Sequence, residues 1–133
     1  MAPLKVCLLL AMVGCGTSGS TANEPVVTPP ADVTLRIGES RTVGAVTISF
    51  VKVNEDSRCP SDVQCVWAGN AAVELSLESA GASPISRVIN SGIDPKTIEE
   101  HGLRISFRQL SPAPRQAAPD TSNPTVVLHV EKP

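Results

Sequence analysis

The chain has 133 residues and a formal net charge of −2, with 18% charged and 41% hydrophobic residues. This length suits one domain with a modest core, and the slightly acidic balance argues against nucleic acid as a partner. Two phenylalanines, one tryptophan and no tyrosine leave too few aromatic rings for a platform that stacks on sugars or bases.

The first residues of the chain predict export. Lys5 precedes an apolar run from Val6 to Val13, which is typical of a signal peptide and too short to cross a bilayer as a helix. The segment ends in Met12-Val-Gly-Cys15, which resembles the lipobox of bacterial lipoproteins. We therefore expect removal of residues 1–14 and acylation of Cys15, with palmitate for example. The alternative is ordinary cleavage near Ala22, which would release a soluble secreted protein.

The expected lipid anchor makes the membrane the first predicted partner, because several acyl chains on one cysteine hold a protein stably at a membrane surface. The resemblance implies a bacterial cell envelope, and Gly16, in place of an aspartate, resembles the pattern that permits sorting to the outer membrane in Gram-negative bacteria. Residues 15–30 are rich in Ser, Thr, Asn and Pro and predict a flexible tether that spans about 20 Å. A domain at residues 31–133 would then lie in the periplasm or outside the cell.

Apolar and polar residues alternate with a period of two in residues 31–133, which predicts half-buried strands. Strands are expected at 33–37, 46–50, 73–77, 103–107 and 126–130, with a weaker edge strand at 85–89. The apolar parity changes between Phe50 and the pair Val51 and Val53, which indicates a bulge or a change of buried face. The pattern predicts an all-β fold, an antiparallel sandwich or small barrel of six or seven strands.

Residues 94–102 break this pattern. Asp94 as N-cap, Pro95 at the first helical position and Gly102 at the end favour one or two helical turns. His101 would lie at the C-terminus of that turn, where an imidazole suits the helix dipole, and His129 would lie on the solvent face of the last strand. Both histidines are interpreted as structural rather than catalytic.

The stretch after the second predicted strand contains two cysteines, Cys59 and Cys65. Pro60 biases Cys59 toward an extended backbone, and an exported chain meets an oxidising compartment. We therefore expect a disulfide that closes a small loop. The alternative, a metal site that combines these cysteines with the two histidines, lacks the ligand spacings of zinc sites.

The only tryptophan, Trp67, follows Cys65 by two positions, so both side chains would point to the same face of an extended segment. We expect Trp67 to pack against the disulfide as part of the core, and the alternative is an exposed binding anchor. Asp56 and Ser57, which precede the first cysteine, are good turn formers.

The runs Asp56-Ser-Arg-Cys-Pro60 and Val63-Gln-Cys-Val-Trp-Ala-Gly69 resemble the signature of a group of short bacterial lipoproteins and secreted proteins with no assigned activity. The similarity extends to Gly38-Glu39, to residues 46–53 and to Leu110-Ser-Pro-Ala-Pro114, so it covers most of the predicted domain. It implies a shared small β fold and export, and it carries over no catalytic residue.

Motifs that carry chemistry are missing from the sequence. It contains no Gly-x-Ser-x-Gly elbow, no His-Glu-x-x-His pair and no phosphate-binding glycine loop, so we predict no catalytic residue, no cofactor and no enzyme. Glu55, Asp56, Asp62 and Asn70 offer oxygen ligands for calcium, but their spacing matches no calcium loop. Solvated turn residues are the simpler interpretation, and no metal site is predicted.

Three functions remain open. The favoured one is a non-catalytic, lipid-anchored envelope module that binds a protein or an envelope component through its cysteine loop. The second is an inhibitor of an envelope or extracellular hydrolase, whose active site the disulfide-braced 59–65 loop would enter at low entropic cost. The third is an enzyme of unknown type. The candidate interaction residues are Arg58, Pro60, Ser61, Asp62, Gln64 and Trp67.

Three of these residues discriminate between kinds of site. Ser61, Asp62 and Gln64 would be exposed on a rigid convex loop in an inhibitor, and would surround a pocket in a ligand site. As exposed turn residues they are expected to tolerate alanine with little loss of stability.

Overall fold

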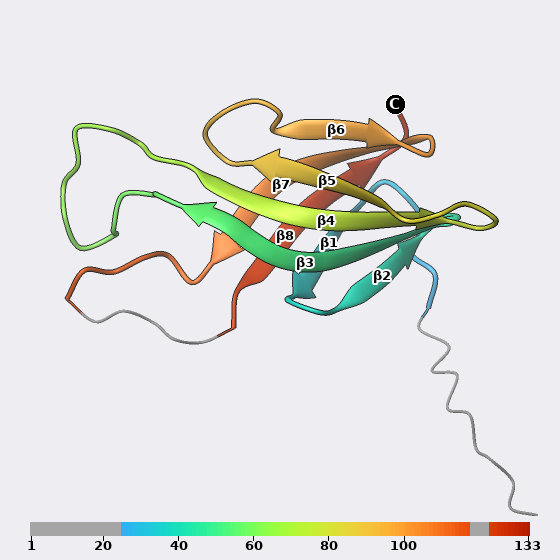
Figure 1. The fold of residues 1–133 in the computed structure, drawn as a ribbon, viewed down its shortest axis with the longest axis horizontal. Coiled ribbons are helices and arrows are strands. Elements are labelled where there is room, and N and C mark those ends of the chain that lie inside the picture. The colour runs from blue at the N-terminus through green and yellow to red at the C-terminus, as the bar shows by residue number, and fades with distance from the viewer. Residues whose placement is uncertain (1–24, 118–122) are drawn as a thin grey trace, which may run out of the picture.

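The computed structural model describes residues 25–117 and 123–133. Eight strands in this part of the chain form two antiparallel sheets of four strands each, and none of the described residues is helical. The sheets lie on one another as the two layers of a sandwich (Figure 1). The predicted all-β antiparallel fold is confirmed, and of the two predicted architectures the sandwich is the one found. The number of strands in the described residues is eight and not the predicted six or seven, because two short strands, β2 (Ser40–Val43) and β6 (Thr97–Glu100), were not expected.

The first sheet is a simple meander of consecutive strands, and the second is a meander that also receives the first strand of the chain. The first sheet has the order β2-β3-β4-β5, with bounds Ser40–Val43, Val46–Asp56, Ala71–Ser79 and Ile85–Asn90. The second has the order β1-β8-β7-β6, with bounds Ala31–Arg36, Thr125–Glu131, Leu103–Ser111 and Thr97–Glu100. The chain therefore changes sheet between β1 and β2 and again between β5 and β6.

The core lies between the sheets and is built from the inward-facing residues of each strand. The largest fully buried side chains include Leu35, Ile48, Phe50, Leu75, Leu77, Ile105 and Leu128. They occupy the parity that the sequence assigns to the buried face, and the six strands expected from the alternation are all present. Burying one such side chain contributes about 1.5–3 kcal/mol, so the alternation accounts for most of what holds the layers together.

The predicted irregularity in the second apolar run is confirmed. The pairing of β3 with β4 shifts register between Phe50 and Lys52 and again between Val53 and Glu55. As a result, Val51 is 41% exposed while Val53 packs partly against the core. The bulges extend β3 beyond the predicted strand and lead it out to the end of the sandwich.

The prediction of helical turns in residues 94–102 is wrong, because this segment contains β6 and a hairpin turn. Ile98 is buried and pairs with Ile105 of β7, and Glu99 accepts a 2.8 Å hydrogen bond from Arg104. These cross-strand contacts outweigh the local capping signals, since propensity is a weak prior against tertiary pairing. The other unpredicted strand, β2, has a single fully buried residue, Val43.

The turn between β6 and β7 consists of His101 and Gly102, both with positive φ, 52° and 75°. Two-residue hairpins favour such turns because their twist matches that of the strands. His101 is thus a turn residue in a left-handed conformation, where asparagine, aspartate, histidine and glycine are the best-tolerated residues. It does not end a helix.

A substitution at His101 tests this conformation. His101→Val places a β-branched residue at positive φ and is expected to lower the free energy of unfolding by about 1–2 kcal/mol. His101→Asn, which tolerates the left-handed region, is the matched control and should leave stability nearly unchanged. Urea denaturation of the two variants measures the difference, and equal stabilities would contradict the turn assignment.

The start of the described chain and the connection between β3 and β4 lie at opposite ends of the sandwich (Figure 1). Val27, within the stretch predicted as a tether, forms a parallel bridge with Val43, accepts a bond from Gly44 N and donates one to Thr42 O, both 2.9 Å. Figure 1 shows this first described part of the chain at one end of the long axis and the β3–β4 connection at the other.

Candidate functional site

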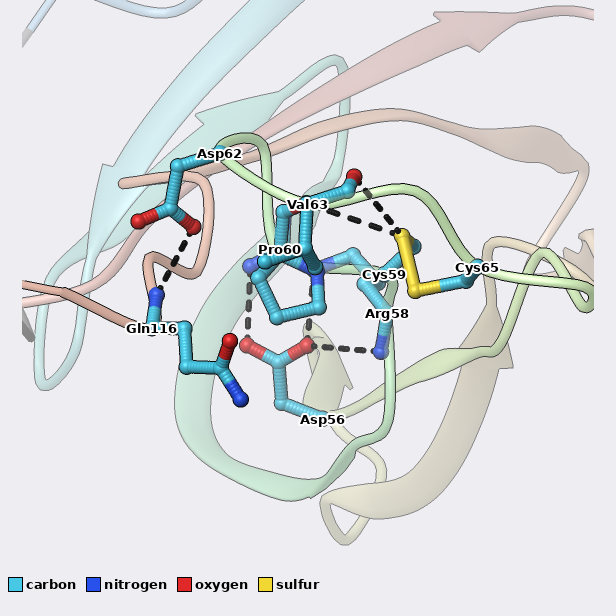
Figure 2. Close-up of a disulfide and its surroundings, with 8 residues drawn as sticks. All are labelled: Asp56, Arg58, Cys59, Pro60, Asp62, Val63, Cys65 and Gln116. Carbon is cyan, nitrogen blue, oxygen red and sulfur yellow. Dashed lines mark hydrogen bonds and ion pairs between the residues drawn. A yellow bond between two sulfur atoms is a disulfide. The ribbon is translucent and has the colours of Figure 1, made fainter.

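The candidate site is the connection between β3 and β4, residues 57–70, here called the cysteine loop. Cys59 and Cys65 form a disulfide with a Cα–Cα distance of 5.8 Å, within the usual range for such bonds. The predicted pairing is confirmed. Pro60 lies between the two cysteines in the ring that the bond closes (Figure 2), which restricts the backbone of the tip of the loop.

Arg58 fixes the start of the cysteine loop to both sheets. Its Nε and Nη2 donate to the two carboxylate oxygens of Asp56 at 2.7 and 2.8 Å. Its Nη1 donates to the carbonyl of Leu110 in β7 at 2.7 Å, and Nη2 donates to that of Pro112 at 3.0 Å. A planar guanidinium satisfies four acceptors in this way, which a lysine cannot do.

The side-chain hydrogen bonds from Arg58 hold the pKa of Asp56 below its ordinary value of 3.8. The carboxylate therefore remains ionised throughout the neutral range. Because the folded pKa is lowered, the stabilisation is complete above the ordinary aspartate pKa and is lost as the pH falls through the lowered value.

Asp62 ties the tip of the loop to the segment that follows β7. Its two carboxylate oxygens accept hydrogen bonds from the backbone N–H groups of Gln116 (2.8 Å) and Ala117 (2.9 Å); the first of these is drawn in Figure 2. Nearby, Ser61 N donates to the carbonyl of Pro114 at 2.8 Å. These backbone donors, with Gln116 first, lower the pKa of the Asp62 carboxyl. Asp62 is therefore a structural contact, and we now expect Asp62→Ala to cost more stability than an exposed turn position would.

The end of the loop is held by close backbone packing. Gly69 has a φ of 70°, and a Cβ atom at this position would lie 1.9 Å from the carbonyl oxygen of Ser57, so no other residue fits. The buried Asn70 donates to Asn90 Oδ1 (3.0 Å) and accepts from Gly92 N (2.9 Å). The loop is therefore held at both ends, by Arg58 at its start and by Gly69 and Asn70 at its end.

The tip exposes three apolar side chains. Val63 is 37% exposed, Trp67 63% and Val66 96%. The expectation that Trp67 packs into the core is wrong, because its side chain is exposed and, like Cys59 and Cys65, is not part of the buried core cluster. The alternative interpretation, an exposed tryptophan, is the one that the structure supports.

The predicted interaction residues therefore divide into two groups. Arg58 and Pro60 are half-buried, whereas Ser61, Gln64 and Trp67 are exposed, together with Asp62, whose carboxylate nevertheless binds backbone. A cavity of about 260 Å³ lies at the same end of the sandwich, and among the predicted residues only Arg58 lines it. Ser61, Asp62 and Gln64 thus lie on the braced loop and not around a pocket.

Sequence reasoning missed two parts of the site. Val66 is the most exposed large apolar residue in the described ranges, although it precedes the tryptophan directly. The segment of residues 110–117, which supplies partners for Arg58, Ser61 and Asp62, follows the loop by about fifty residues in the sequence. The run Leu110 to Pro114 was noted in the sequence, but nothing in it indicated a contact with the loop.

The two histidines lie on the second sheet, apart from the cysteine loop. His129 Nδ1 lies 2.7 Å from Asp32 Oδ1 on the outer face of the second sheet, and the half-buried His101 lies in its hairpin turn. Within residues 25–117 and 123–133, no three His, Cys, Asp or Glu side chains are grouped to hold a metal ion. In the same ranges no helix has the length and apolar character needed to cross a membrane. Cys15 lies outside the described residues.

Comparisons of the chain with models of known protein families, with curated proteins and with solved structures gave no match.

The role of Arg58 can be tested by truncation. Arg58→Ala removes the bonds to Asp56, Leu110 and Pro112 and is expected to lower the free energy of unfolding by about 2–3 kcal/mol. Arg58→Lys should recover only part of this loss, because an ammonium cannot bridge the same acceptors.

The matched control is Arg108→Ala, an exposed arginine of β7, which should change stability by less than about 0.5 kcal/mol. Urea denaturation gives the stabilities, and hydrogen exchange should show faster amide exchange in the cysteine loop of Arg58→Ala only. A loss for Arg108→Ala as large as that for Arg58→Ala would refute the special role of Arg58.

Proposed function

We propose that the protein is a non-catalytic, lipid-anchored module of the bacterial cell envelope, and that it binds a protein or another envelope component through the cysteine loop. The observation that carries this proposal is the contrast within the loop. Arg58 and Asp62 are used to fix the loop, while Val66 and Trp67 are left exposed at its tip.

Exposed apolar side chains on a fixed loop can form a contact surface for a binding partner. Tryptophan is enriched among residues that dominate binding energy, and an adjacent fully exposed valine extends the apolar area that a partner can cover. A disulfide and hydrogen bonds hold the backbone, so little conformational entropy is lost on binding. The loop therefore suits recognition of a concave apolar surface.

The position of the loop agrees with a lipid anchor at Cys15. The first described residues lie at the opposite end of the sandwich from the cysteine loop (Figure 1). In a domain tethered at that end, the loop would face away from the membrane, toward proteins or envelope polymers. The signal peptide, the lipobox resemblance and the composition of residues 16–30 support the anchor itself.

The absence of enzymatic activity is proposed from the sequence, which contains none of the motifs tested above. In the structure, the charged residues Arg58 and Asp62 hold the loop in place, and the apolar residues Val66 and Trp67 are exposed. Ser61, Asp62 and Gln64 are exposed on a braced loop, which is what an inhibitor of a hydrolase would need. Inhibition is therefore the second candidate function.

The binding role is tested with the full chain as bait in an envelope extract. Trp67→Ala and Val66→Ala should each reduce capture of the partner about tenfold or more while changing stability by less than about 1 kcal/mol, because both side chains are exposed. Val88→Ala, an exposed valine of β5, is the matched control and should capture the partner normally.

The outcomes separate the two functions. A captured hydrolase that loses activity with the parent chain but not with Trp67→Ala would establish inhibition. Equal capture by the parent and both loop variants would exclude the cysteine loop as the contact. Tryptophan fluorescence of the parent chain should have the red-shifted maximum of an exposed indole, which also shifts to the blue when the partner binds.

The anchor is tested separately with Cys15→Ser. The parent chain should yield a mature N-terminus at an acylated Cys15 and should fractionate with membranes. The variant should be neither acylated nor retained there. Mass spectrometry of the mature protein provides the measurement, and an unmodified N-terminus near Ala22 in the parent would show ordinary secretion instead.

A further inference from the structure

A cavity lies beside the cysteine loop and is lined by residues other than the exposed tip. It lies where β3 and β7 end, has a volume of about 260 Å³, and its apolar lining consists of Val53, Leu110, Pro112, Ala113, Pro114 and Pro124. Asp56, Arg58, Ser111 and Arg115 supply its polar atoms. The exposed tip residues Val66 and Trp67 are not part of it, so a ligand here is independent of the proposed contact surface.

Most polar groups of the wall are already used within the protein. The carbonyls of Leu110 and Pro112 accept from Arg58, and that of Pro114 accepts from Ser61 N. The prolines of the lining have no N–H to donate. A ligand that enters the cavity therefore meets a mainly apolar surface with few hydrogen-bonding groups to satisfy.

The described residues of the lining carry both signs of charge. Among them Arg58 and Arg115 each contribute one positive charge and Asp56 one negative charge. Both oxygens of Asp56 already accept bonds from Arg58. The backbone N–H groups of Gln116 and the next residue lower the pKa of the Asp62 carboxyl, and the exposed Arg115 guanidinium lies near enough to add to this effect. Asp62 already accepts hydrogen bonds from those two N–H groups, so Arg115 can still bind a second anionic group that enters the cavity.

We propose that this cavity binds a short apolar chain that ends in a carboxylate, with the chain against the prolines and Leu110 and the carboxylate on Arg115. The volume lies just below the range of about 300–1,000 Å³ that is usual for drug-sized ligands, so it suits a single short chain. A carboxylate matches the guanidinium in charge and geometry. A short fatty acid and the C-terminal apolar residue of a peptide share this chemistry.

The test uses hexanoate and an N-acetylated tetrapeptide that ends in leucine with a free carboxylate. Each is titrated into the full chain and followed by NMR chemical shifts. Binding should shift resonances of Val53, Leu110 and Ala113 first. 1-Hexanol and the amidated peptide are the neutral controls, and each should bind at least about tenfold more weakly than its charged counterpart.

A matched pair of variants tests Arg115. Arg115→Gln should weaken binding of the charged probes about tenfold, whereas Arg108→Gln on β7 should bind them like the parent. Binding of hexanoate alone assigns the site to fatty acids, binding of the peptide alone assigns it to peptide C-termini, and either result supports the shared chemistry. Binding of neither probe at millimolar concentration, or equal binding of the neutral controls, overturns the proposal.

Discussion

At the end of the sandwich where the cysteine loop emerges, the guanidinium of Arg58 connects Asp56, the last residue of β3, with backbone carbonyls at the end of β7 and just after it. Asp56 belongs to the first sheet and Leu110 to the second, and Arg58 binds both. The sheets are covered there by connections and not by further strands, so this contact holds their ends together. The position of the cysteine loop, the wall of the cavity and the path of residues 112–117 all depend on it.

The disulfide acts within the frame that Arg58 provides. A ring as short as Cys59 to Cys65 removes little entropy from the unfolded chain, so its effect is local. It limits the shapes of the tip, while Asp62 and Gly69 determine where the tip lies relative to the sheets. Some residues of the loop, such as Asp62 and Gly69, fix its backbone, and others, Val66 and Trp67, are exposed at its surface. Val66 and Trp67 can be changed without disturbing the bonds that fix the backbone.

The strands could be predicted from the sequence because burial on one face of a sheet produces a period of two. Val46, Ile48 and Phe50 show this directly, and the change of parity at Val51 located the bulge in β3. β2 and β6 were missed because each is four residues long and carries a single fully or nearly buried residue, Val43 and Ile98. Only pairing with a neighbouring strand makes them strands.

Of the candidate site, only the disulfide could be predicted from the sequence. The pairing of Cys59 with Cys65 could be predicted from their proximity in the sequence and from the expectation of an exported chain. The parity argument failed for Trp67 because it assumed an extended segment facing the core, whereas the loop leaves the sheets before Cys59. The contacts of Arg58 with Leu110 of β7 and with Pro112 just after it join positions 52 and 54 residues apart, and no local pattern encodes such a distance.

The bridge between Val27 and Val43 gives the fold a mechanical property. If the chain is anchored through its N-terminus, a pull on the anchor reaches the two hydrogen bonds of Val27 before it reaches β1. These bonds attach a single residue to the edge strand β2, and they can open and close again while the layers stay packed. In a chain anchored in this way, the contact of Val27 would yield before the strands of the sandwich separate.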